Sequence, residues 1–523
     1  MIRARWRRPA GGPGINIAEL FDDGLRRNGD HPALWFEGRW WSSSELNRAG
    51  HGLAGGLRSL DIVPGDRVLV TMMNCPEVGT SYLGAWTAGA AVVPVLFLLT
   101  ADELRHIAAD SAAVAVITTP ELLSKVREVA ASVPSLRHLI CVGGGEGAVD
   151  FAELAGQAPI DTPHPVSDTD AAVLLYTSGT TGKPKGVVLS HGNLRTSAEN
   201  GHTAWDAGDG QVGLGCLPLS HVYGLSTTLA GTFRRGSSAL MRWFDAAGVL
   251  ELIEEHRVTI TALVPAMMVA LLDHPDLPNR DVSSLRWVVS GAAPLPLDLL
   301  ERFEAAFGCT VLQGYGLSES TAQCSLNTPD HNRPGSVGRP LPGVEVVVVD
   351  RDGQRLPAGE DGEILLRGGN VMHGYHGMAE ETARAVVDGW LHTGDVGHLD
   401  ADGYLYVLDR SKDLIIRGGF NIIPRDVEEV LVAHPAVGQA AVIGLPDERL
   451  GEVVHADVML TPGAAATEAE LIAHCRERLA AYKCPQSIHI VGALPLNSVG
   501  KVLKRQLRSE HVGAAPASSA GAR

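Results

Sequence analysis

Hydrophobic positions in the first part of the chain follow two alternating periods. Within residues 16–28, Ile17, Leu20, Phe21 and Leu25 fall on one helical face, and Asn16 and Glu19 have the spacing of a capping box. Continuous apolar runs predict strands at 67–73, 90–95 and 113–118, and helical patterns lie through Trp86 and at 101–109. This alternation is typical of an α/β fold with largely parallel sheets covered by helices.

The last hundred residues predict a separate small unit. Strands are expected at 437–443, 454–460 and 486–491, and helices at 424–431 and 467–482. Thr467 and Glu470 form a capping box, and the helix that follows has a buried stripe of Leu471, Ile472, Cys475 and Leu479. The glycines of residues 143–147 lack the strand–helix framing of a dinucleotide site, so we expect a surface turn there.

Composition narrows the classes of partner. The 523 residues are 45% hydrophobic and 20% charged, which is typical of a globular protein of several domains. The formal net charge is −17, so nucleic acid is an unlikely partner on electrostatic grounds. A small anionic nucleotide remains compatible with this charge, because a local loop is enough to bind it.

Cysteine usage and the N-terminus indicate the compartment. The seven cysteines are an odd number without C-x-x-C spacing, which argues against a disulfide framework or a zinc site and favours a cytoplasmic protein. Four arginines within residues 3–8 are followed by a Pro- and Gly-rich stretch rather than an apolar core, so we expect no secretory signal. No apolar run is long enough to predict a transmembrane helix.

The most informative segment is Tyr176-Thr-Ser-Gly-Thr-Thr-Gly-Lys-Pro-Lys-Gly186, which joins two apolar runs. Its glycines expose backbone N–H groups, and its hydroxyl groups and lysines suit phosphate oxygens. A flexible surface loop has the same composition, so composition alone leaves both interpretations open. The segment is not a Walker A loop, because two residues separate Gly179 from Gly182 and Pro184 follows Lys183.

This segment resembles the signature of the adenylate-forming superfamily, and most closely that of acyl-CoA synthetases. Six further segments resemble motifs of the same family in the same order, over about residues 15 to 507. They are Pro218-Leu-Ser-His-Val-Tyr-Gly224, Ser290-Gly-Ala-Ala-Pro294, Gln313-Gly-Tyr-Gly-Leu-Ser-Glu319, His392-Thr-Gly-Asp395, Leu408-Asp-Arg-Ser-Lys412 and Asn497-Ser-Val-Gly-Lys501.

The resemblance implies ATP-dependent formation of an acyl-adenylate from a carboxylic acid, with release of pyrophosphate. Catalytic roles fall on Lys501, Glu319 and Thr177, with Glu319 as the Mg²⁺ ligand. Tyr315 would stack on adenine, flanked by glycines that let the base come close, and Asp395 would accept hydrogen bonds from the ribose hydroxyls. The implied nucleotide-binding set is Thr177, Ser178, Gly179, Thr180, Thr181, Gly182, Lys183, Gly291, Ala292, Ala293, Gln313, Gly314, Tyr315, Gly316, Ser318, Asp395, Arg410 and Lys501.

The resemblance also implies a division into domains. Residues 15–411 would form a large N-terminal domain of doubly wound sheets with a β-rich subdomain, and residues 412–507 a small, mobile α+β domain. Lys412 would be the hinge, and Gly418 and Gly419 would admit the pantetheine thiol. We expect residues 1–14 and 508–523 to be disordered.

The implied acyl pocket consists of small or apolar residues, so we expect an apolar acid that is bulky or long. Its members are His221, Tyr223, Gly224, Val264, Pro265, Gly314, Gly316 and Leu317. Amino-acid adenylation domains place an Asp near the His221 segment, but none lies between Pro218 and Thr228. This absence argues against α-amino acids as substrates.

The leading hypothesis is a carboxylic acid–CoA ligase that uses ATP, Mg²⁺ and coenzyme A. One alternative is an acyl-AMP ligase that passes its product to a carrier protein or a partner enzyme. A luciferase-like oxygenase shares these motifs, and a non-catalytic nucleotide-binding protein would be expected to lose Lys501, Glu319 or Asp395, all of which are present. We expect a monomer or homodimer, without nucleic acid or a transmembrane segment.

Overall fold

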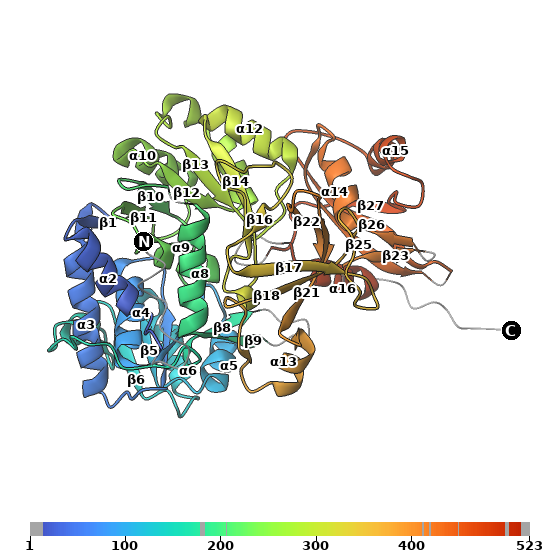
Figure 1. Ribbon diagram of the computed structural model, residues 1–523. Helices are drawn as coiled ribbons and strands as arrows, with labels where there is room; N and C mark the ends of the chain where they lie inside the picture. Colours follow the sequence, from blue (N-terminus) through green and yellow to red (C-terminus); the bar gives the residue numbers. More distant parts are fainter. Residues whose placement is uncertain are drawn as a thin grey trace. The chain divides into compact units, whose positions relative to one another are not determined.

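The computed structural model describes residues 14–177, 184–205, 207–410, 413–417, 420–447, 449–496 and 502–513. By their internal contacts these residues form two compact units (Figure 1). Unit 1 contains residues up to 346 together with 365–392, and unit 2 contains residues 347–364 and those from 393 onward. The expected α/β class is confirmed. The domain boundary expected at Lys412 stays a prediction, because residue 412 lies outside the described residues.

The first sheet of unit 1 is parallel over most of its width. Its strands, in spatial order, are β19 (Gly374–Tyr375), β9 (Lys185–Ser190), β8 (Ala171–Thr177), β4 (Ala91–Pro94), β3 (Arg67–Thr71), β5 (Ala115–Thr118), β6 (His138–Cys141) and β7 (Val149–Asp150). The accompanying helices are α2 (Glu19–Asn28), α3 (Ser43–Ser59), α4 (Pro76–Ala88), α5 (Ala101–Asp110), α6 (Pro120–Ala130), α7 (Phe151–Ala155) and α8 (His191–Ala204). Among the described strands of this sheet, the antiparallel pairs are β8 with β9 and β9 with β19.

The second sheet of unit 1 has the same layered character. Its strands, in spatial order, are β16 (Arg339–Pro340), β15 (Ser325–Leu326), β14 (Thr310–Tyr315), β13 (Trp287–Ser290), β12 (Ile260–Leu263), β10 (Val212–Gly215), β11 (Ser237–Leu240), β1 (Pro32–Phe36) and β2 (Arg39–Ser42). Its helices are α9 (Val222–Gly231), α10 (Ala246–His256), α11 (Pro265–Leu272) and α12 (Leu297–Phe307), with short 3₁₀ turns η1 (Leu277–Asn279) and η2 (Ser318–Ser320). The six strands from β14 to β1 are mutually parallel.

The cores confirm the interpretation of the apolar runs as buried strands. All four residues of β4 and all four of β5 are buried, as expected for parallel strands with both faces covered. Trp86 on α4 is fully buried, and its indole Nε1 donates a hydrogen bond to the carbonyl of Ala172 at 2.9 Å. This bond fastens α4 to β8 and satisfies the one polar group of a large apolar side chain.

The first helix begins later than the sequence indicates. Glu19 accepts a hydrogen bond from the backbone N–H of Asn16, which is half of the expected capping box. The Asn16 side-chain oxygen accepts from the Ala18 N–H at 3.0 Å, and the Asn16 amide donates to the carbonyls of Trp86 and His164. Asn16 therefore caps the first turn as expected and also satisfies backbone groups distant in sequence, although the regular helix α2 starts at Glu19. The glycine segment at 143–147 is a turn, as expected, with four glycines at positive φ.

A third sheet lies in the later part of the chain, and the boundary between the units passes through its strands. These are β17 (Val344–Val349), β18 (Gly362–Gly368), β21 (Trp390–Leu399) and β20 (Val386–Val387), with β22 (Leu405–Arg410) paired to β21. Helix α13 (Ala379–Ala385) precedes β20. This sheet corresponds to the β-rich subdomain expected from the resemblance.

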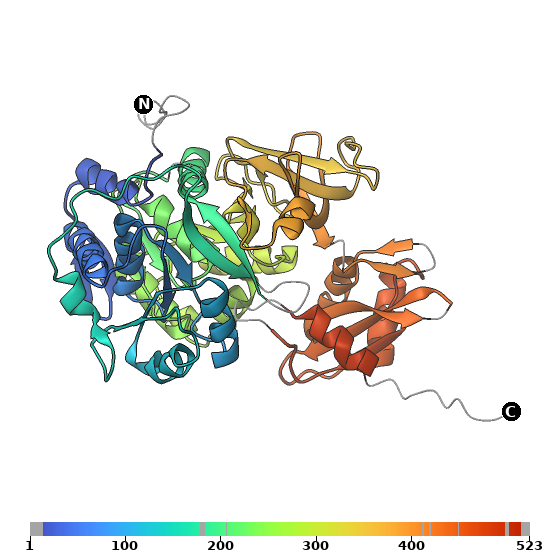
Figure 2. The same ribbon diagram turned by 90° about the horizontal axis from the view of Figure 1, so that it is seen from below.

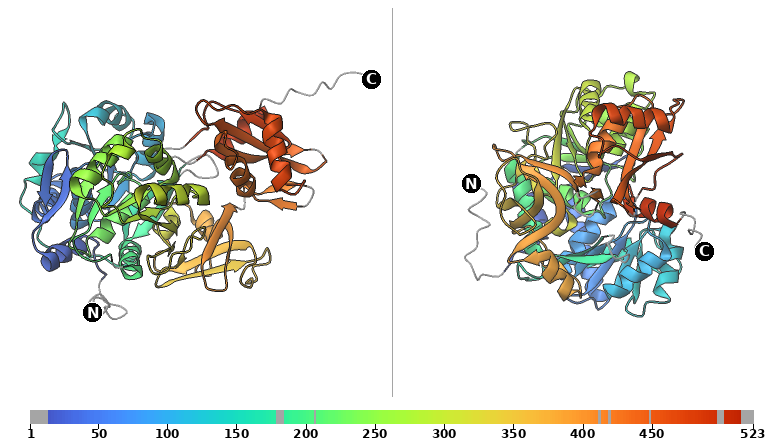
Figure 3. Two further views of the ribbon diagram at one scale, coloured as in Figure 1. Left: turned by 90° about the horizontal axis from the view of Figure 1, so that it is seen from above. Right: turned by 90° about the vertical axis from the view of Figure 1, so that its right-hand side faces the viewer.

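Unit 2 contains an α+β fold with its own core. Its sheet consists of β24 (Phe420–Ile422), β23 (Ile415–Arg417), β26 (Gly451–Leu460) and β25 (Val437–Asp447), with β27 (Ser487–Ile490) parallel to β26. Helices α14 (Pro424–Val432) and α15 (Glu468–Arg478) pack on this sheet, and the helices of this unit are visible beside its orange-to-red strands in Figure 3. The capping box of Thr467 and Glu470 is confirmed, whereas α15 ends four residues before the expected position.

Residues 508–513, which we expected in a disordered tail, are helical. They belong to α16 (Lys504–Gly513), which lies against β25 (Figure 2). Leu507 is 3% exposed and packs with Ala441 and Ile443. Arg508 donates hydrogen bonds to the Gly444 carbonyl and to Glu452. These contacts are long-range, so the Ala- and Ser-rich composition that follows did not reveal them.

None of the helices in the described part of the chain has both the length and the apolar character needed to cross a bilayer. All seven cysteines are buried, and their sulfurs are thiols rather than members of disulfides.

A buried ion pair joins the first two helices. His51 on α3 is 6% exposed, its Nε2 lies 2.8 Å from an Asp22 oxygen, and its Nδ1 lies 2.5 Å from the Ile160 carbonyl. Two acceptors require two N–H donors, which only the protonated imidazole offers. The hydrogen bond with Asp22 raises the pKa of His51 against the effect of burial. Burial raises the pKa of Asp22, but the hydrogen bonds from His51 and Asn47 outweigh it and hold that pKa below its ordinary value.

We expect His51→Gln to lower the melting temperature most at mildly acidic pH. Because the folded-state pKa of His51 is raised, its stabilisation is fully present below the unfolded value of about 6.5 and is lost as pH rises through the folded pKa. Calorimetric melting from about pH 5.5 to about pH 8.5 would measure this. The exposed His331→Gln serves as control. A His51→Gln deficit that does not shrink with rising pH would contradict the charged pair.

Candidate functional site

Three predicted segments meet at the carboxyl ends of neighbouring parallel strands. Leu263, Ser290 and Gln313 stand side by side in register, at the last residues of β12 and β13 and two residues before the end of β14. The chain leaves β12 as Val264-Pro265 and β13 as Gly291-Ala292, while Gly314 and Tyr315 end β14 and are followed by Gly316-Leu317. Ligands of open α/β sheets bind at this edge, so the topology gathers the predicted adenine and acyl residues where a ligand is expected.

Close approaches between these segments fix their mutual positions. A Cβ atom added to Gly291 would lie 3.4 Å from the Gly314 carbonyl and 3.7 Å from the Tyr223 ring. Tyr223 is 7% exposed, and its hydroxyl donates to the Val289 carbonyl at 3.1 Å. Burial raises the pKa of this phenol, so it stays protonated and serves as a fixed wall of the site.

The glycine after Tyr315 has a role in addition to the one expected. A Cβ atom on Gly316 would lie 1.6 Å from the carbonyl oxygen of Ala322, an impossible contact, so this glycine lets the chain fold back on itself. Its expected role of letting the base approach stays a prediction. The Tyr315 carbonyl accepts a hydrogen bond from the Cys324 N–H at 2.9 Å, which closes the same turn.

Backbone strain is concentrated beside these segments. Ala292 has φ +66°, and Thr321 and Ala322 have φ +53° and +77°, a region that residues with side chains rarely adopt. Ala292 directly follows Gly291 at the carboxyl end of β13. Such outliers persist where the surrounding structure imposes them, and they are frequent at functional sites.

Glu319 lies on the short turn η2 and is held by a tyrosine that sequence reasoning missed. Its Oε1 accepts a hydrogen bond from the Tyr375 hydroxyl at 2.9 Å, and its carbonyl accepts from the Met372 N–H. Tyr375 is on β19, which pairs with β9 of the first sheet. The bond therefore connects the segment after β14 to the hairpin that carries the phosphate-loop motif. The glycine-flanked run Gly374-Tyr375-His376-Gly377 was the available signal.

Lys185, expected to add positive charge to the phosphate loop, has a partner of its own. Its Nζ lies 2.6 Å from a Glu381 oxygen, and the ammonium is 5.2 Å from the centre of the Tyr375 ring. This lysine thus braces the base of the hairpin. Thr177 ends β8 directly opposite Lys185. Ser178, Gly179, Thr180, Thr181, Gly182 and Lys183 lie outside the described residues.

His221 is the N-cap residue of α9 and is neutral. Its Nδ1 accepts a hydrogen bond from the Tyr223 N–H, which assigns the ring proton to Nε2. Burial lowers the pKa of His221 to about 4, so the imidazole carries no charge near neutral pH.

The predicted acyl residues form an apolar wall. Tyr223 and Val264 pack with Leu217, with Ala262, Ala266, Met267 and Val289 around them. Gly224 is required by the main chain, because a Cβ atom there would lie 2.3 Å from the Pro218 carbonyl. Pro265 is buried in the first turn of α11.

The other nucleotide and support residues are placed as follows. Gln313 is 6% exposed, and its side-chain oxygen accepts from the Gly335 N–H at 3.3 Å. Ala293 follows Ala292 in the same loop, and Ser318 begins η2. In unit 2, Asp395 is 4% exposed and pairs through its backbone with Arg410 across β21 and β22. Lys412, Gly418, Gly419 and Lys501 lie outside the described residues.

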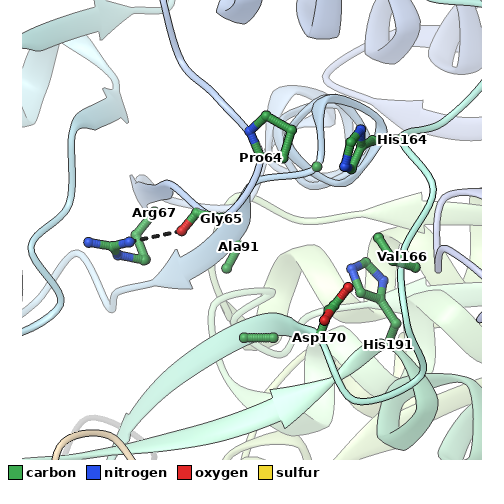
Figure 4. A pocket seen from close by; sticks show the side chains of 10 residues that line it. Pro64, Gly65, Arg67, Ala91, His164, Val166, Asp170 and His191 are labelled. Atoms are coloured by element: carbon green, nitrogen blue, oxygen red, sulfur yellow. Dashed lines mark hydrogen bonds between the residues drawn. The ribbon is translucent and has the colours of Figure 1, made fainter.

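A separate pocket of about 340 Å³ lies at the amino ends of the parallel strands of the first sheet (Figure 4). It is lined where strands β3, β4 and β8 begin, by residues that include Arg67, Ala91 and Asp170. His191 faces it, but its Nδ1 accepts from the Ile17 N–H, and burial lowers its pKa to about 4. These contacts are structural, and the amino ends of parallel strands are not the usual ligand edge.

Two family models match the chain. The model described as AMP-binding enzyme matches residues 21–376, and the model described as AMP-binding enzyme C-terminal domain matches residues 426–501.

Curated relatives and solved structures cover nearly the whole chain. A feruloyl-CoA synthase of Amycolatopsis sp is 39% identical over 89% of this chain and 93% of its own length. A long-chain-fatty-acid–CoA ligase of Bacillus subtilis (strain 168) is 35% identical over 95% of each chain. The crystal structure of the anthranilate CoA ligase AuaEII in complex with anthranoyl-AMP is 29% identical, with a TM-score of 0.89 over 95% of this chain and 97% of that one.

We expect Tyr375→Phe to weaken metal-dependent turnover without unfolding the chain. Loss of the hydrogen bond to the Glu319 carboxylate removes its positioning, at a cost of about tenfold in kcat/KM. The readout is the Mg²⁺ concentration needed for half-maximal rate, which should rise, while the melting temperature stays near that of the parent.

The matched control for this prediction is Tyr482→Phe, a 37% exposed tyrosine in unit 2. An unchanged Mg²⁺ requirement in Tyr375→Phe would show that Glu319 needs no such support.

Proposed function

We propose that this chain, which belongs to the AMP-binding enzyme family, activates an apolar carboxylic acid with ATP and transfers the acyl group to CoA. It is an AMP-forming acid–thiol ligase. Its relatives are named for the activities of a feruloyl-CoA synthase and a long-chain-fatty-acid–CoA ligase, and these activities support both the adenylation and the CoA step.

One observation carries the proposal for the nucleotide. The Gly291-Ala292 turn, the Gln313 to Gly316 segment and Glu319 all lie at or directly after the carboxyl ends of the neighbouring strands β13 and β14. Backbone groups after β13 offer donors and acceptors to the adenine edge, and Tyr315 offers a face for stacking. In unit 2, the Asp395 carboxylate accepts from the ribose hydroxyls.

Glu319 fits the requirements of a Mg²⁺ ligand. The ion prefers oxygen donors and uses few protein carboxylates, keeping phosphate oxygens and water as its other ligands. Glu319 is fixed through one oxygen by Tyr375, so its carboxylate is oriented before metal arrives. When bound, the metal neutralises charge on the phosphates.

The central chemical difficulty is that two anions must meet, the acyl carboxylate and the α-phosphate. Lys501 supplies the flexible cation for this step, and the N–H and hydroxyl groups of residues 177–182 hold the phosphate oxygens. The family model for the C-terminal domain extends to residue 501. After adenylation, rotation about Lys412 brings Gly418 and Gly419 toward the acyl-adenylate for attack by the thiol.

The acid is apolar because the wall that receives it offers no charge. Tyr223 has its hydroxyl bonded to the Val289 carbonyl, and His221 is neutral. No carboxylate occurs in residues 218–228 to bind an α-amino group. The buried cysteine thiols are consistent with a cytoplasmic location.

The function is tested by one mass-spectrometric assay. The chain is incubated with ATP, Mg²⁺ and a pool of fatty, hydroxycinnamic, aromatic and polycyclic acids, with and without CoA. We expect acyl-CoA only in the arm with CoA, and its mass identifies the acid. Acyl-AMP that persists despite CoA would show that the acyl group goes to an acceptor other than CoA. The absence of both products would refute the activation of an apolar acid.

We expect Lys501→Ala to lower adenylation by about 10² to 10³-fold, as loss of one transition-state donor does elsewhere. Pyrophosphate release measures this step. Thioester formation from supplied acyl-AMP should change far less, because the lysine acts before the domain rotates. Lys504→Ala is the control. Lys504 begins α16, and its Nζ pairs with Glu428 of α14 at 2.8 Å. Near-parental pyrophosphate release in Lys501→Ala would remove the lysine from the mechanism.

A further inference from the structure

Unit 2 contains a cluster of three histidines around one buried aspartate that the ligase reaction does not use. His455 and Asp457 lie on β26, His489 lies on β27, and His511 lies near the end of α16. Asp457 is 1% exposed and His455 5% exposed. The ligand atoms of His455, Asp457 and His511 all lie within 4.8 Å of one another.

The contacts in this cluster are too many for the protons available. His511 Nε2 lies 3.0 Å from each oxygen of Asp457 and 3.1 Å from His455 Nε2. A ring nitrogen carries at most one proton, so it donates to only one of these three acceptors. A single cation at the centre would satisfy the two nitrogens and the carboxylate at once.

The separations match the edges of a tetrahedral coordination shell. Zinc–nitrogen and zinc–oxygen bonds of about 2.0–2.2 Å at tetrahedral angles place neighbouring ligand atoms about 3.3–3.6 Å apart. The observed separations within the cluster are 3.0 and 3.1 Å, and 3.6 Å between His455 Nε2 and Asp457. The two separations that involve His511 are slightly short, and a small outward adjustment of its side chain, which is 23% exposed, brings all three into range.

The surroundings of His455 have the form found around metal-ligating histidines. Its other ring nitrogen, Nδ1, lies 2.7 Å from the Ser487 hydroxyl on β27. A hydroxyl can accept from Nδ1–H, and this arrangement leaves Nε2 free as a ligand. His489 stands opposite Asp457 in the strand register, with its Nδ1 3.5 Å from the same carboxylate, so a third imidazole lies at the rim.

Cysteine spacing, which argued against a zinc site, has no bearing on a site built from histidine and aspartate.

We propose that His455, Asp457 and His511 form a binding site for a divalent transition metal of the zinc type, with His489 or water as the fourth ligand. Imidazole and carboxylate donors suit Zn²⁺, and three protein ligands from two elements make a site that fastens α16 to the sheet. The site is structural in character and independent of the proposed ligase chemistry.

The test uses the full-length chain without an affinity tag, stripped with a chelator and titrated with Zn²⁺ in excess Mg²⁺. We expect one tightly bound Zn²⁺ per chain, measured by competition with a chromophoric chelator and by elemental analysis. Zn²⁺ should raise the melting temperature of unit 2 by several degrees, since a ligand that binds only the folded state stabilises it. Absence of such binding in the parent would overturn the site.

Variants separate this site from adventitious binding. We expect His455→Gln and His511→Gln to weaken Zn²⁺ binding by more than 100-fold, and Ser487→Ala by about 10-fold through its support of His455. His474→Gln is the control, because His474 is in the same unit and its Nε2 bonds to the Val430 carbonyl, away from the cluster. Equal binding by His511→Gln and the parent would refute the proposal.

Ser487→Ala keeps the test decisive if a ligand variant fails to fold, since it leaves all three ligands in place. Cobalt(II) gives a second readout, because its visible spectrum reports tetrahedral nitrogen and oxygen coordination. We expect a tetrahedral spectrum in the parent that is lost in His455→Gln. An octahedral spectrum in the parent, unaltered by His455→Gln, would mean that the cluster is only a hydrogen-bonded network.

Discussion

The buried turn at residues 318–323 is the constraint on which the rest of the site in unit 1 depends. Thr321 and Ala322 both have positive φ, which costs of order 1–3 kcal/mol for each such residue. Hydrogen bonds from distant elements offset this cost. Asn370 donates through its side chain to the carbonyls of Ser320 and Gln323, and the Ser197 hydroxyl donates to the carbonyl of Thr321. The turn is thus held from α8 on one side and from the segment before β19 on the other.

This turn fixes the segment after β14 relative to the hairpin of β8 and β9. These are two parts of the proposed nucleotide site. Gly316, at the start of the turn, packs against the Ala322 carbonyl and so fixes where Tyr315 leaves β14. Glu319, within it, is tied through Tyr375 to the strands that carry the phosphate-loop motif. One strained loop therefore couples the edge of the second sheet to the hairpin of the first. A reaction that joins two anions needs such fixed geometry, because donors that reorganise during the reaction stabilise the transition state less.

The sequence predicted the strands and helix starts that are determined by neighbouring residues. Apolar runs identified β3, β4 and β5, and the capping box at Thr467 located the start of α15, because the residues that determine these features are neighbours in sequence. Two features were missed for the opposite reason, namely the amide hydrogen bonds of Asn16 and the helix α16. The acceptors of the Asn16 amide are 70 and 148 residues away, and Leu507 is buried by strands more than 60 residues earlier. No window of the sequence contains both sides of these contacts.

The residues of the candidate site likewise fall into those that sequence motifs identify and those that only long-range contacts reveal. The motifs identified Glu319 and Tyr315 by resemblance, yet the physical reasons for their placement lie in Tyr375, Asn370 and the Ala322 carbonyl, which no motif singled out. For Gly316 the structure adds a packing reason that the motif did not give. Resemblance thus names the residues proposed to touch substrate, whereas the structure supplies those that hold them in place.

The helix missed at the C-terminus bears directly on the chemistry of unit 2. Leu496 and Val502 form a β-bridge on either side of residues 497–501, and the Leu503 N–H bonds to the Pro495 carbonyl. The described residues on either side of 497–501 are therefore held together. The chain after them continues into α16, which is held by Leu507 in the core and by Arg508 on Glu452. A cation at His455, Asp457 and His511 would fasten the far end of the same helix. Because a long, flexible lysine is useful in catalysis only when its backbone is fixed, the packing of α16 limits how well Lys501 can be positioned.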